Sequence, residues 1–555
     1  MLKIKKITKG RLWIFSLSIL CLVVFSCNKN DEDSINYDFS KGNGTIGVRL
    51  GKKLENPYSI SNMQRAYDTL LAKGLVSDTL RIKASHLYIK IIPQDSIEMN
   101  HILADTNLEL FPYPLDYEIE GIGEYIVGEN STPVLYSVIP ADYHIDNMIH
   151  YEVLERCFIP DESEHNPELA LLEAEALKLT NNYHENGDSK VSNKQKFSWP
   201  QFGYPKGYVK VKVTETSNYE GVRKIKVRIR NVVKVSSVYT NSNGYYSSKK
   251  GFLSDVHYSA VFENERGFKI WSNLGPFSPA IHNVGWHRKS GYDIIIGANS
   301  CAWPWATINN AALDYYDKVC PSFQVQKPYN GLRFWYLSGN RFVDNIADGW
   351  AGSAPMLRNL ALSQAQLATY LFVLGLLENN PTLSYVTAGI YGIMLCLPDI
   401  FITNVDEPNT NDLRAHVFHE MSHASHYAQV GSAYWVQYIF QICCNFIATG
   451  GENAYGDSLN GNNNIIGVGE MWASYFEYQC TDVVHNYHRG LQDTDEWYAP
   501  QILKEIDDVS DSITPRSIFD ALVFQVQTHD DLRRELIGRY GLQNEINQIF
   551  ESNGF

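Results

Sequence analysis

The chain has 555 residues, of which 62 are acidic and 47 are basic, and its formal net charge is −15. With 44% hydrophobic residues it can bury large apolar cores, but its length exceeds what one core usually serves. We therefore expect about three or four folded units. No Lys/Arg-rich tract follows the N-terminus, so the basic footprint of a nucleic-acid-binding protein is missing and we expect no nucleic-acid partner.

The N-terminus has the layout of a secretion signal. A basic segment ends at Arg11, the apolar run Leu12–Phe25 follows, and Ser26 and Cys27 close it. The sequence Leu22–Cys27 resembles a bacterial lipobox, which implies a signal peptide over residues 1–26 and lipidation of Cys27. An uncleaved N-terminal anchor is the alternative, although the run is short for a bilayer span.

The expected mature N-terminus is polar and acidic. Its first residues after the cysteine, Asn28–Asp33, resemble the export tag of Bacteroidota-type lipoproteins. This resemblance implies an outer-membrane lipoprotein that is exposed at the cell surface and contacts the membrane through lipidated Cys27. An ordinary flexible tether over residues 27–42 explains the same composition without any receptor.

Residues 43–160 combine helical and strand patterns. A helical stretch over Ser59–Lys73 is followed by alternating apolar and polar residues in His86–Ile92 and Val134–Val138. The pattern predicts a small N-terminal α/β module. It carries no motif from which chemistry follows.

Residues 161–198 are expected to link this module to the next. The stretch Pro167–Leu179 is rich in Glu, Ala and Leu and predicts a helix. The polar stretch Asn181–Lys196 has no apolar period and predicts an irregular linker.

Residues 199–271 alternate strictly, most clearly in Val209–Val213 and Ile225–Ile229, which is typical of half-buried antiparallel strands. The pair Asn243-Gly244 tolerates positive φ and predicts a turn. Together with Pro205–Tyr208, these features resemble the carboxypeptidase regulatory-like β-sandwich. The resemblance implies a spacer domain over about 70 residues.

Residues 272–555 are expected to be mostly helical. Tyr385–Ile402 is almost uniformly apolar, but Gly and Pro residues interrupt it, so we interpret it as a buried helix followed by a strand over Asp399–Thr403. The predicted fold class is thus multidomain α+β: an N-terminal α/β module, a β-sandwich middle domain and a mostly α-helical C-terminal domain.

The segment Asn411–His426 contains the most informative motif. It has capping residues at its start and no Gly or Pro, so it predicts a helix. On a helix, His419 and His423 lie one turn apart on the same face and can both reach one tetrahedral Zn²⁺. Glu420 lies on the side where a bound water would sit. This is the His-Glu-x-x-His arrangement of zinc metallopeptidases.

His416 and His426 extend the histidine stripe in both directions. Each lies about 10 Å from the far histidine of the motif, because a helix rises about 1.5 Å per residue. We therefore expect them to flank the site without completing one coordination sphere. The third ligand must come from elsewhere, since the sequence lacks the third histidine of metzincins after His423.

The segment Gly467–Glu477 predicts a second helix, with Glu470 near its start as the expected third ligand. Small Ala473 permits close approach of the two helices, and Ser474 is placed to hydrogen-bond a ligating group. Glu477, on the same face two turns later, is the alternative ligand. The apolar neighbours of Glu470 indicate a buried helix, in which a carboxylate needs a partner and a cation suits.

Two histidines plus a helical glutamate resemble the gluzincin pattern of zinc metallopeptidases. The resemblance implies a zincin-like domain over residues 272–555 that hydrolyses peptide bonds of extracellular proteins or peptides through a zinc-activated water, with Glu420 as the general base. His485, Tyr487 and His488 are expected candidates for stabilising the transition state. By the same analogy, the strand Asp399–Thr403 would be the edge strand along the cleft.

Two other functions stay open at this point. A surface protein that binds host protein or glycan could carry a structural or degenerate zinc site, but such a site has no use for Glu420. A zinc-storage lipoprotein could use all four histidines of the stripe and would bind more than one zinc ion.

Overall fold

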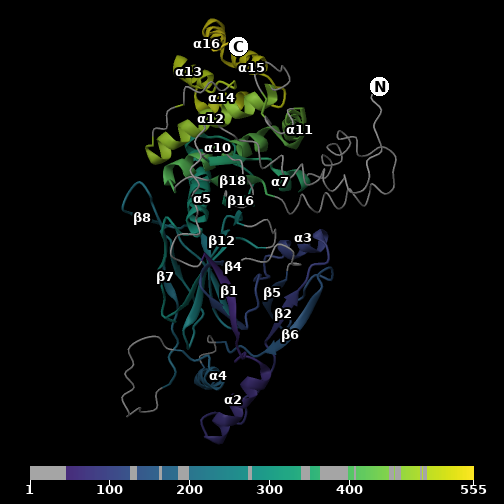
Figure 1. Cartoon of the computed structure of the whole chain (residues 1–555), viewed down its shortest axis with the longest axis vertical. Coiled ribbons are helices and arrows are strands. Elements are labelled where there is room, and N and C mark those ends of the chain that lie inside the picture. Colours follow the sequence, from purple (N-terminus) through teal and green to yellow (C-terminus); the bar gives the residue numbers. More distant parts are fainter. Residues whose placement is uncertain are drawn as a thin grey trace, which may run out of the picture. The chain divides into compact units, whose positions relative to one another are not determined.

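The computed structural model describes residues 46–125, 134–161, 166–184, 199–272, 278–338, 350–362, 398–404, 408–448, 455–456, 464–487, 491 and 497–555. The chain is a mixed α+β protein with several sheets. Its contacts divide it into two compact units between Asn309 and Asn310. We call them the N-terminal unit (Asp38–Asn309) and the C-terminal unit (Asn310–Phe555) (Figure 1).

The strands of the N-terminal unit form three groups. An antiparallel sheet has the order β5 (Leu135–Pro140), β2 (His86–Ile91) and β6 (Tyr151–Cys157). A larger group runs β13 (Lys269–Trp271), β12 (Val256–Asn264), β14 (Ile281–His287), β4 (Ile122–Tyr125), β1 (Ile46–Lys53) and β3 (Tyr117–Glu120), with β9 (Ile225–Asn231) on β12 and β10 (Lys234–Tyr239) on β9. The third group is β11 (Tyr245–Ser247), β7 (Lys206–Lys212) and β15 (Ile294–Ile296), with β8 (Tyr219–Gly221) also on β7.

These pairings join segments that the sequence assigns to different modules. Strand β14 follows residue 271 but pairs with β12 on one side and with β4 on the other. The two alternating segments near Val209 and Ile225 form β7 and β9, which lie in different groups. The division into modules at 160, 198 and 271 is finer than the division into two units and stays a prediction, as does the regulatory-like family.

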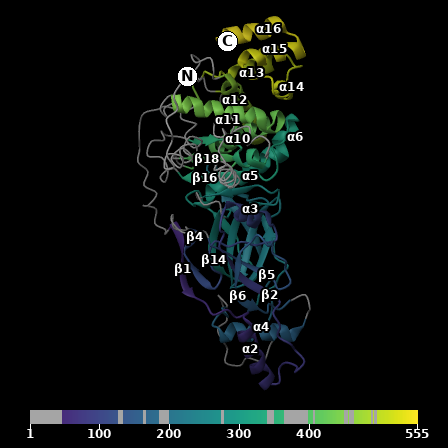
Figure 2. The ribbon, with the colours of Figure 1, turned by 90° about the vertical axis from the view of Figure 1, so that its right-hand side faces the viewer.

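The helices of the N-terminal unit are α2 (Ile60–Ala72), α3 (Ser96–Ala104) and α4 (Pro167–Leu179), so both helices predicted there are present. Ser59 caps α2 by accepting a hydrogen bond from the Asn62 amide at 3.2 Å. Helix α4 packs beside α2, as Figure 2 shows. On α4 the buried Glu173 accepts hydrogen bonds from Lys234 Nζ at 3.0 Å.

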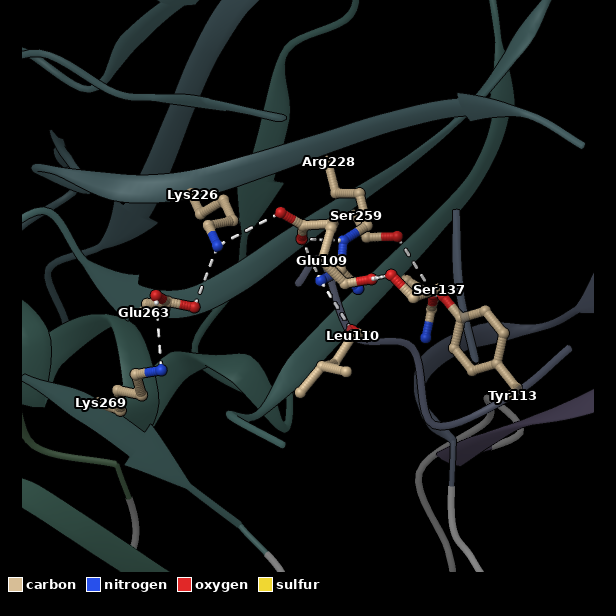
Figure 3. A network of polar contacts seen from close by, with 10 residues as sticks. Glu109, Leu110, Tyr113, Ser137, Lys226, Arg228, Ser259, Glu263 and Lys269 are labelled. Carbon is tan, nitrogen blue, oxygen red and sulfur yellow. Dashed lines mark hydrogen bonds and ion pairs between the residues drawn. The ribbon is translucent and has the colours of Figure 1, made fainter. Parts of the chain in front are cut away.

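A polar network ties the segment around Glu109 to the sheet of β9 and β12 (Figure 3). Arg228 Nε donates to Glu109 Oε1 at 2.8 Å, and Lys226 Nζ lies 3.4 Å from Glu109 Oε2 and 3.1 Å from Glu263 Oε2. Burial alone raises the pKa of Glu109, but the charges of Arg228 and Lys226 outweigh it and lower that pKa. The network therefore holds ionised groups inside the unit by pairing them.

The C-terminal unit combines a short sheet with helices. Strand β18 (Ile400–Asn404) runs parallel to β16 (Arg333–Ser338) and antiparallel to β17 (Trp350–Ser353). The helices are α5 (Ala302–Asp314), which crosses the boundary between the units, the π-helix η3 (Tyr315–Val319), α6 (Cys320–Phe323), α7 (Leu357–Leu362), α10 (Thr410–Val430), α11 (Ser432–Ala448), α12 (Asn464–His485), α13 (Gln501–Val509), α14 (Pro515–Ala521), α15 (His529–Tyr540) and α16 (Gln543–Ser552).

The sheet corrects one expectation. The strand predicted over Asp399–Thr403 is β18, but it lies between β16 and β17, so it is not the edge strand. Within the described residues β17 is the terminal strand on this side, and it packs against α10. The helix expected over Tyr385–Pro398 lies almost entirely outside the described residues. None of the described helices has both the length and the apolar character needed to cross a membrane.

Candidate metal centre

Helix α10 carries the His-Glu-x-x-His motif, and its ends follow from the sequence. Asn409, one residue before the predicted capping residues, caps it by accepting a hydrogen bond from the Asp412 amide at 3.1 Å. At the other end the chain leaves the helix at Gly431, whose φ is +82°. Between these points there is no Gly or Pro, so the helix is continuous through His419 and His423.

Helix α12 lies beside α10 and brings Glu470 to both histidines. A glycine before the glutamate permits a close approach to a third helix, α11. A Cβ atom at Gly469 would lie 2.7 Å from Cε2 of Tyr438, so any larger residue there would push α12 and α11 apart. Steric contact with Tyr438 therefore explains why the residue before Glu470 is a glycine.

The three expected ligands converge. Nε2 of His419 lies 3.3 Å from Oε2 of Glu470, and Nε2 of His423 lies 3.3 Å from Oε1 of the same carboxylate. Ligand atoms of a tetrahedral zinc site with bonds of 2.0–2.1 Å are about 3.3 Å apart, so these separations suit the ion. In the described part of the chain, these residues are the one group of His, Cys, Asp or Glu side chains close enough to share a metal.

Electrostatics favour a positive charge at this place. Burial by itself raises the pKa of Glu470, but the charges and hydrogen bonds of His423 and His419 reverse the shift and hold that pKa well below its usual range. Burial by itself lowers the pKa of His419, but the hydrogen bonds that its ring donates to Glu470 and Glu477 hold that pKa well above its usual value. Two imidazoles and a carboxylate are the ligand types that zinc prefers, so the donor set fits this ion.

Glu477 orients the first histidine. Its Oε2 lies 3.2 Å from Nδ1 of His419, so the ring presents Nε2 to Glu470. A carboxylate on the far nitrogen of a ligating histidine fixes the ring and raises its basicity. Ser474, the residue expected in such a role, makes no hydrogen bond to His419, His423 or Glu470 in the structure. The supporting contact thus comes from Glu477, which the sequence offered as an alternative ligand.

Glu420 is fully buried, and neither of its carboxylate oxygens accepts a hydrogen bond from a described residue. Nε2 of His416 is 3.8 Å from Oε1, beyond hydrogen-bonding distance. Burial raises the pKa of Glu420 to about 8. The negative charges of Glu470 and Glu477 also raise this pKa, whereas the charge of His419 lowers it. A buried carboxyl group without a hydrogen bond from the described residues is costly, and its oxygens are suited to accept one from a water molecule or a ligand.

Strand β17 lies against this carboxylate. A Cβ atom at Gly352 would lie 2.3 Å from Nε2 of His416 and 2.5 Å from Oε1 of Glu420. The backbone of the terminal strand therefore passes directly over the two side chains, and any larger residue would require His416, Glu420 or the strand to shift. The sequence contains no pattern that identifies Gly352 in advance.

The two outer histidines of the stripe, His416 and His426, lie in different environments. The ring of His416 lies parallel to that of His419 with centroids 6.2 Å apart, at the Glu420 side of the site. His426 is fully buried against Tyr434 and Trp435, and burial lowers its pKa to about 3. His426 is therefore a neutral core residue.

The structure places two of the expected transition-state stabilisers away from the ligands. His485 lies fifteen residues after Glu470 on one helix, about 22 Å along its axis, and its ring stacks on Phe418. The Tyr487 hydroxyl donates to Asp412 Oδ1 at 3.0 Å, near the start of α10. Proximity in sequence was misleading because α12 continues as far as His485. His488 lies outside the described residues, as does Cys27.

Sequence reasoning missed Tyr438 on α11. Its hydroxyl donates a hydrogen bond to Oε1 of Glu470 at 2.5 Å, and its ring lies 6.1 Å from that of His423. Gly469 is the only sequence signal that points to it, because a glycine beside a ligand indicates that another group approaches closely. Among the described residues, Tyr438 is the one hydroxyl group that donates to the glutamate.

Comparison of the chain with models of known protein families, with curated proteins and with solved structures gives no match. Interpretation of the site therefore depends on its own geometry and chemistry.

Proposed function

We propose that this chain is a zinc-dependent metallopeptidase of the gluzincin-like kind, in which His419, His423 and Glu470 hold the ion. The observation that carries the proposal is Glu420, which is fully buried, accepts no hydrogen bond from the residues that the structure describes, and follows a proposed ligand by one residue. A structural metal site gains nothing from such a group. A hydrolase needs one to move a proton.

His419, His423 and Glu470 would hold the ion. When bound there, zinc would supply Lewis-acid chemistry, which polarises a carbonyl group and lowers the pKa of a water molecule. Glu420 accepts a proton from the attacking water and transfers it to the leaving amine. Burial raises the pKa of Glu420, and a bound zinc ion beside it would lower that pKa again, so the two effects act in opposite directions on the group that takes up and releases the proton.

The terminal strand β17 is the proposed docking place for substrate. It has a neighbour on one side only within the described residues, and Gly352 lies over Glu420. An extended peptide can add to such a strand through backbone hydrogen bonds, with its scissile bond beside the carboxylate. The proposed substrates are extended segments of extracellular proteins or peptides, and we propose that lipidated Cys27 holds the enzyme at the outer surface of the cell.

The storage function has less support, because the described residues offer one site with three ligands and His426 belongs to the core. The binding-protein function stays the alternative. In that case zinc would serve the fold, and Glu420 could be replaced without loss of function.

The proposal is tested on residues 28–555 with a broad panel of proteins and peptides. Wild type is expected to bind one zinc ion and to cleave, whereas Glu420→Gln should keep the metal and lose at least about 10²-fold in rate. Glu551→Gln changes an exposed glutamate on α16 in the same way and serves as the control. Absence of zinc in wild type, or full activity in Glu420→Gln, would contradict the proposal.

A further inference from the structure

One face of the β7 sheet in the N-terminal unit is exposed and carries tyrosines and lysines. Along β7 the side chains alternate, so Val209 and Val211 are buried while Tyr208, Lys210 and Lys212 lie on the opposite face. The neighbouring strands add Tyr245, which pairs with Tyr208, and Tyr219, which pairs with Lys212. We call these five exposed-side residues the tyrosine–lysine face.

The tyrosines form two aromatic platforms. The rings of Tyr208 and Tyr245 have centroids 5.2 Å apart, and Tyr219 lies opposite Lys212, four residues along β7. At about 3.3 Å per residue, the two platforms are about 13 Å apart. Tyr208 and Tyr219 are 38% and 46% exposed, so their rings are accessible to a ligand.

The lysines supply positive charge that no carboxylate of the described residues pairs with. Nζ of Lys210 lies 4.9 Å from the ring centroid of Tyr208, and Nζ of Lys212 lies 5.2 Å from that of Tyr219. Neither lysine forms an ion pair with a carboxylate of the described residues. In a chain with net charge −15, two adjacent lysines that face aromatic rings in place of acids are an uncommon local excess of positive charge.

We propose that the tyrosine–lysine face binds an extended polyanionic glycan, a polysaccharide that carries carboxylate or sulfate groups. Aromatic rings stack on the C–H faces of sugar rings, and lysines pair with the acidic groups between them. Side chains on one face of a strand form a straight row, so they can contact successive sugars of a linear polymer that lies along the strand.

Two other negatively charged ligands, nucleic acid and an anionic membrane, suit the tyrosine–lysine face less well. Affinity for nucleic acid depends mainly on many cations that contact phosphates, and this face offers two lysines, whereas stacking of sugar rings on the tyrosines can supply a larger share of the affinity for a glycan. A membrane requires apolar side chains that can insert, but the exposed aliphatic residue on this face is Ile295 alone among the described strands. The tyrosines lie within strands and not on projecting loops.

The probes are polygalacturonate, which carries carboxylates, and dextran sulfate, with neutral dextran, oligo-dT and vesicles containing anionic lipid as comparisons. Residues 28–555 are expected to bind at least one of the two acidic glycans, and affinity should fall as salt rises. The variant Lys210→Glu/Lys212→Glu should weaken binding at least tenfold. Tyr219→Ala should weaken it severalfold.

Lys178→Glu is the matched control, because Lys178 also lies over a tyrosine, with Nζ 5.2 Å from the ring of Tyr183, but on α4. It should bind like wild type. Tyr219 and Lys178 are exposed and Lys210 and Lys212 are half-buried, and none of them belongs to the core, so the variants are expected to fold, which circular dichroism checks. Failure to bind either acidic glycan, equal binding after the double charge reversal, or tighter binding to oligo-dT or vesicles overturns the proposal. The test needs neither zinc nor peptidase activity.

Discussion

The Tyr438 hydroxyl donates a hydrogen bond of 2.5 Å to Oε1 of Glu470, so a neutral donor from α11 fixes the carboxylate that two histidines of α10 also contact. The ligand set is thus held by three helices. This arrangement makes the position of Glu470 sensitive to Tyr438, which is not one of the three proposed ligands.

The substitution Tyr438→Phe removes this donor and keeps the ring. Zinc affinity should fall about 10- to 100-fold, because partners of ligands typically contribute that much. Competition with a chromogenic chelator measures the change. Tyr434→Phe is the control, since the Tyr434 hydroxyl on the same helix donates instead to the carbonyl of Val526 at 3.1 Å. Equal zinc affinity in wild type and Tyr438→Phe would contradict the assigned role.

Replacement of the two glutamates of α12 should separate a ligand from its support. Glu470→Ala removes a proposed ligand and should abolish stoichiometric zinc binding. Glu477→Ala removes the contact to Nδ1 of His419 and should keep one zinc ion per chain with affinity reduced about 10- to 100-fold. Elemental analysis after dialysis against graded chelator distinguishes them. The opposite ranking would make Glu477 the ligand.

The substitution Gly352→Ala tests the approach of β17 to Glu420. The added Cβ would lie within 2.5 Å of Glu420 Oε1, so the carboxylate or the strand must shift. We expect a loss of about 1–3 kcal/mol in the free energy of unfolding and slower cleavage with the zinc content unchanged. Gly538→Ala on α15 has no heavy atom within 4 Å of its Cβ and is the control. Unaltered stability and rate in Gly352→Ala would show that the strand lies further away.

Buried histidines should make the N-terminal unit acid-sensitive. Burial lowers the pKa of His282 to about 4 and holds that of His257 well below its usual value. The unfolded chain, with histidine pKa values near 6.5, binds these protons first, so the free energy of unfolding falls as the pH drops below about 6.5. At pH 5, His282 alone should cost roughly 1–2 kcal/mol.

Denaturant unfolding at pH 7.5 and pH 5 measures this dependence. His282→Gln cannot titrate in this range and should lose part of the pH dependence. A variant with the full dependence of wild type would place the proton uptake elsewhere, for example at the histidines of the metal site.

Local sequence was sufficient for several helices and strands and for the placement of His419 and His423 on one helix face. The N-capping pattern and the absence of Gly and Pro predict the helix of His419 and His423, and the one-turn spacing places both on one face. Alternation predicts β7 and β9, and Pro167 begins α4 as expected at a first helical position. These properties depend on residues within a few positions of each other, so the order of residues alone carries them.

Contacts between distant segments could not be obtained in this way. Ser474 and Glu477 lie on one helix face, and only the position of α10 against α12 decides that Glu477 contacts His419. Tyr438 and Gly352 come from a helix and a strand whose approach depends on packing at Gly469 and over Glu420. Periodicity determines which way a side chain points on its own element, but what it meets there depends on the long-range packing of all elements, which no local pattern encodes.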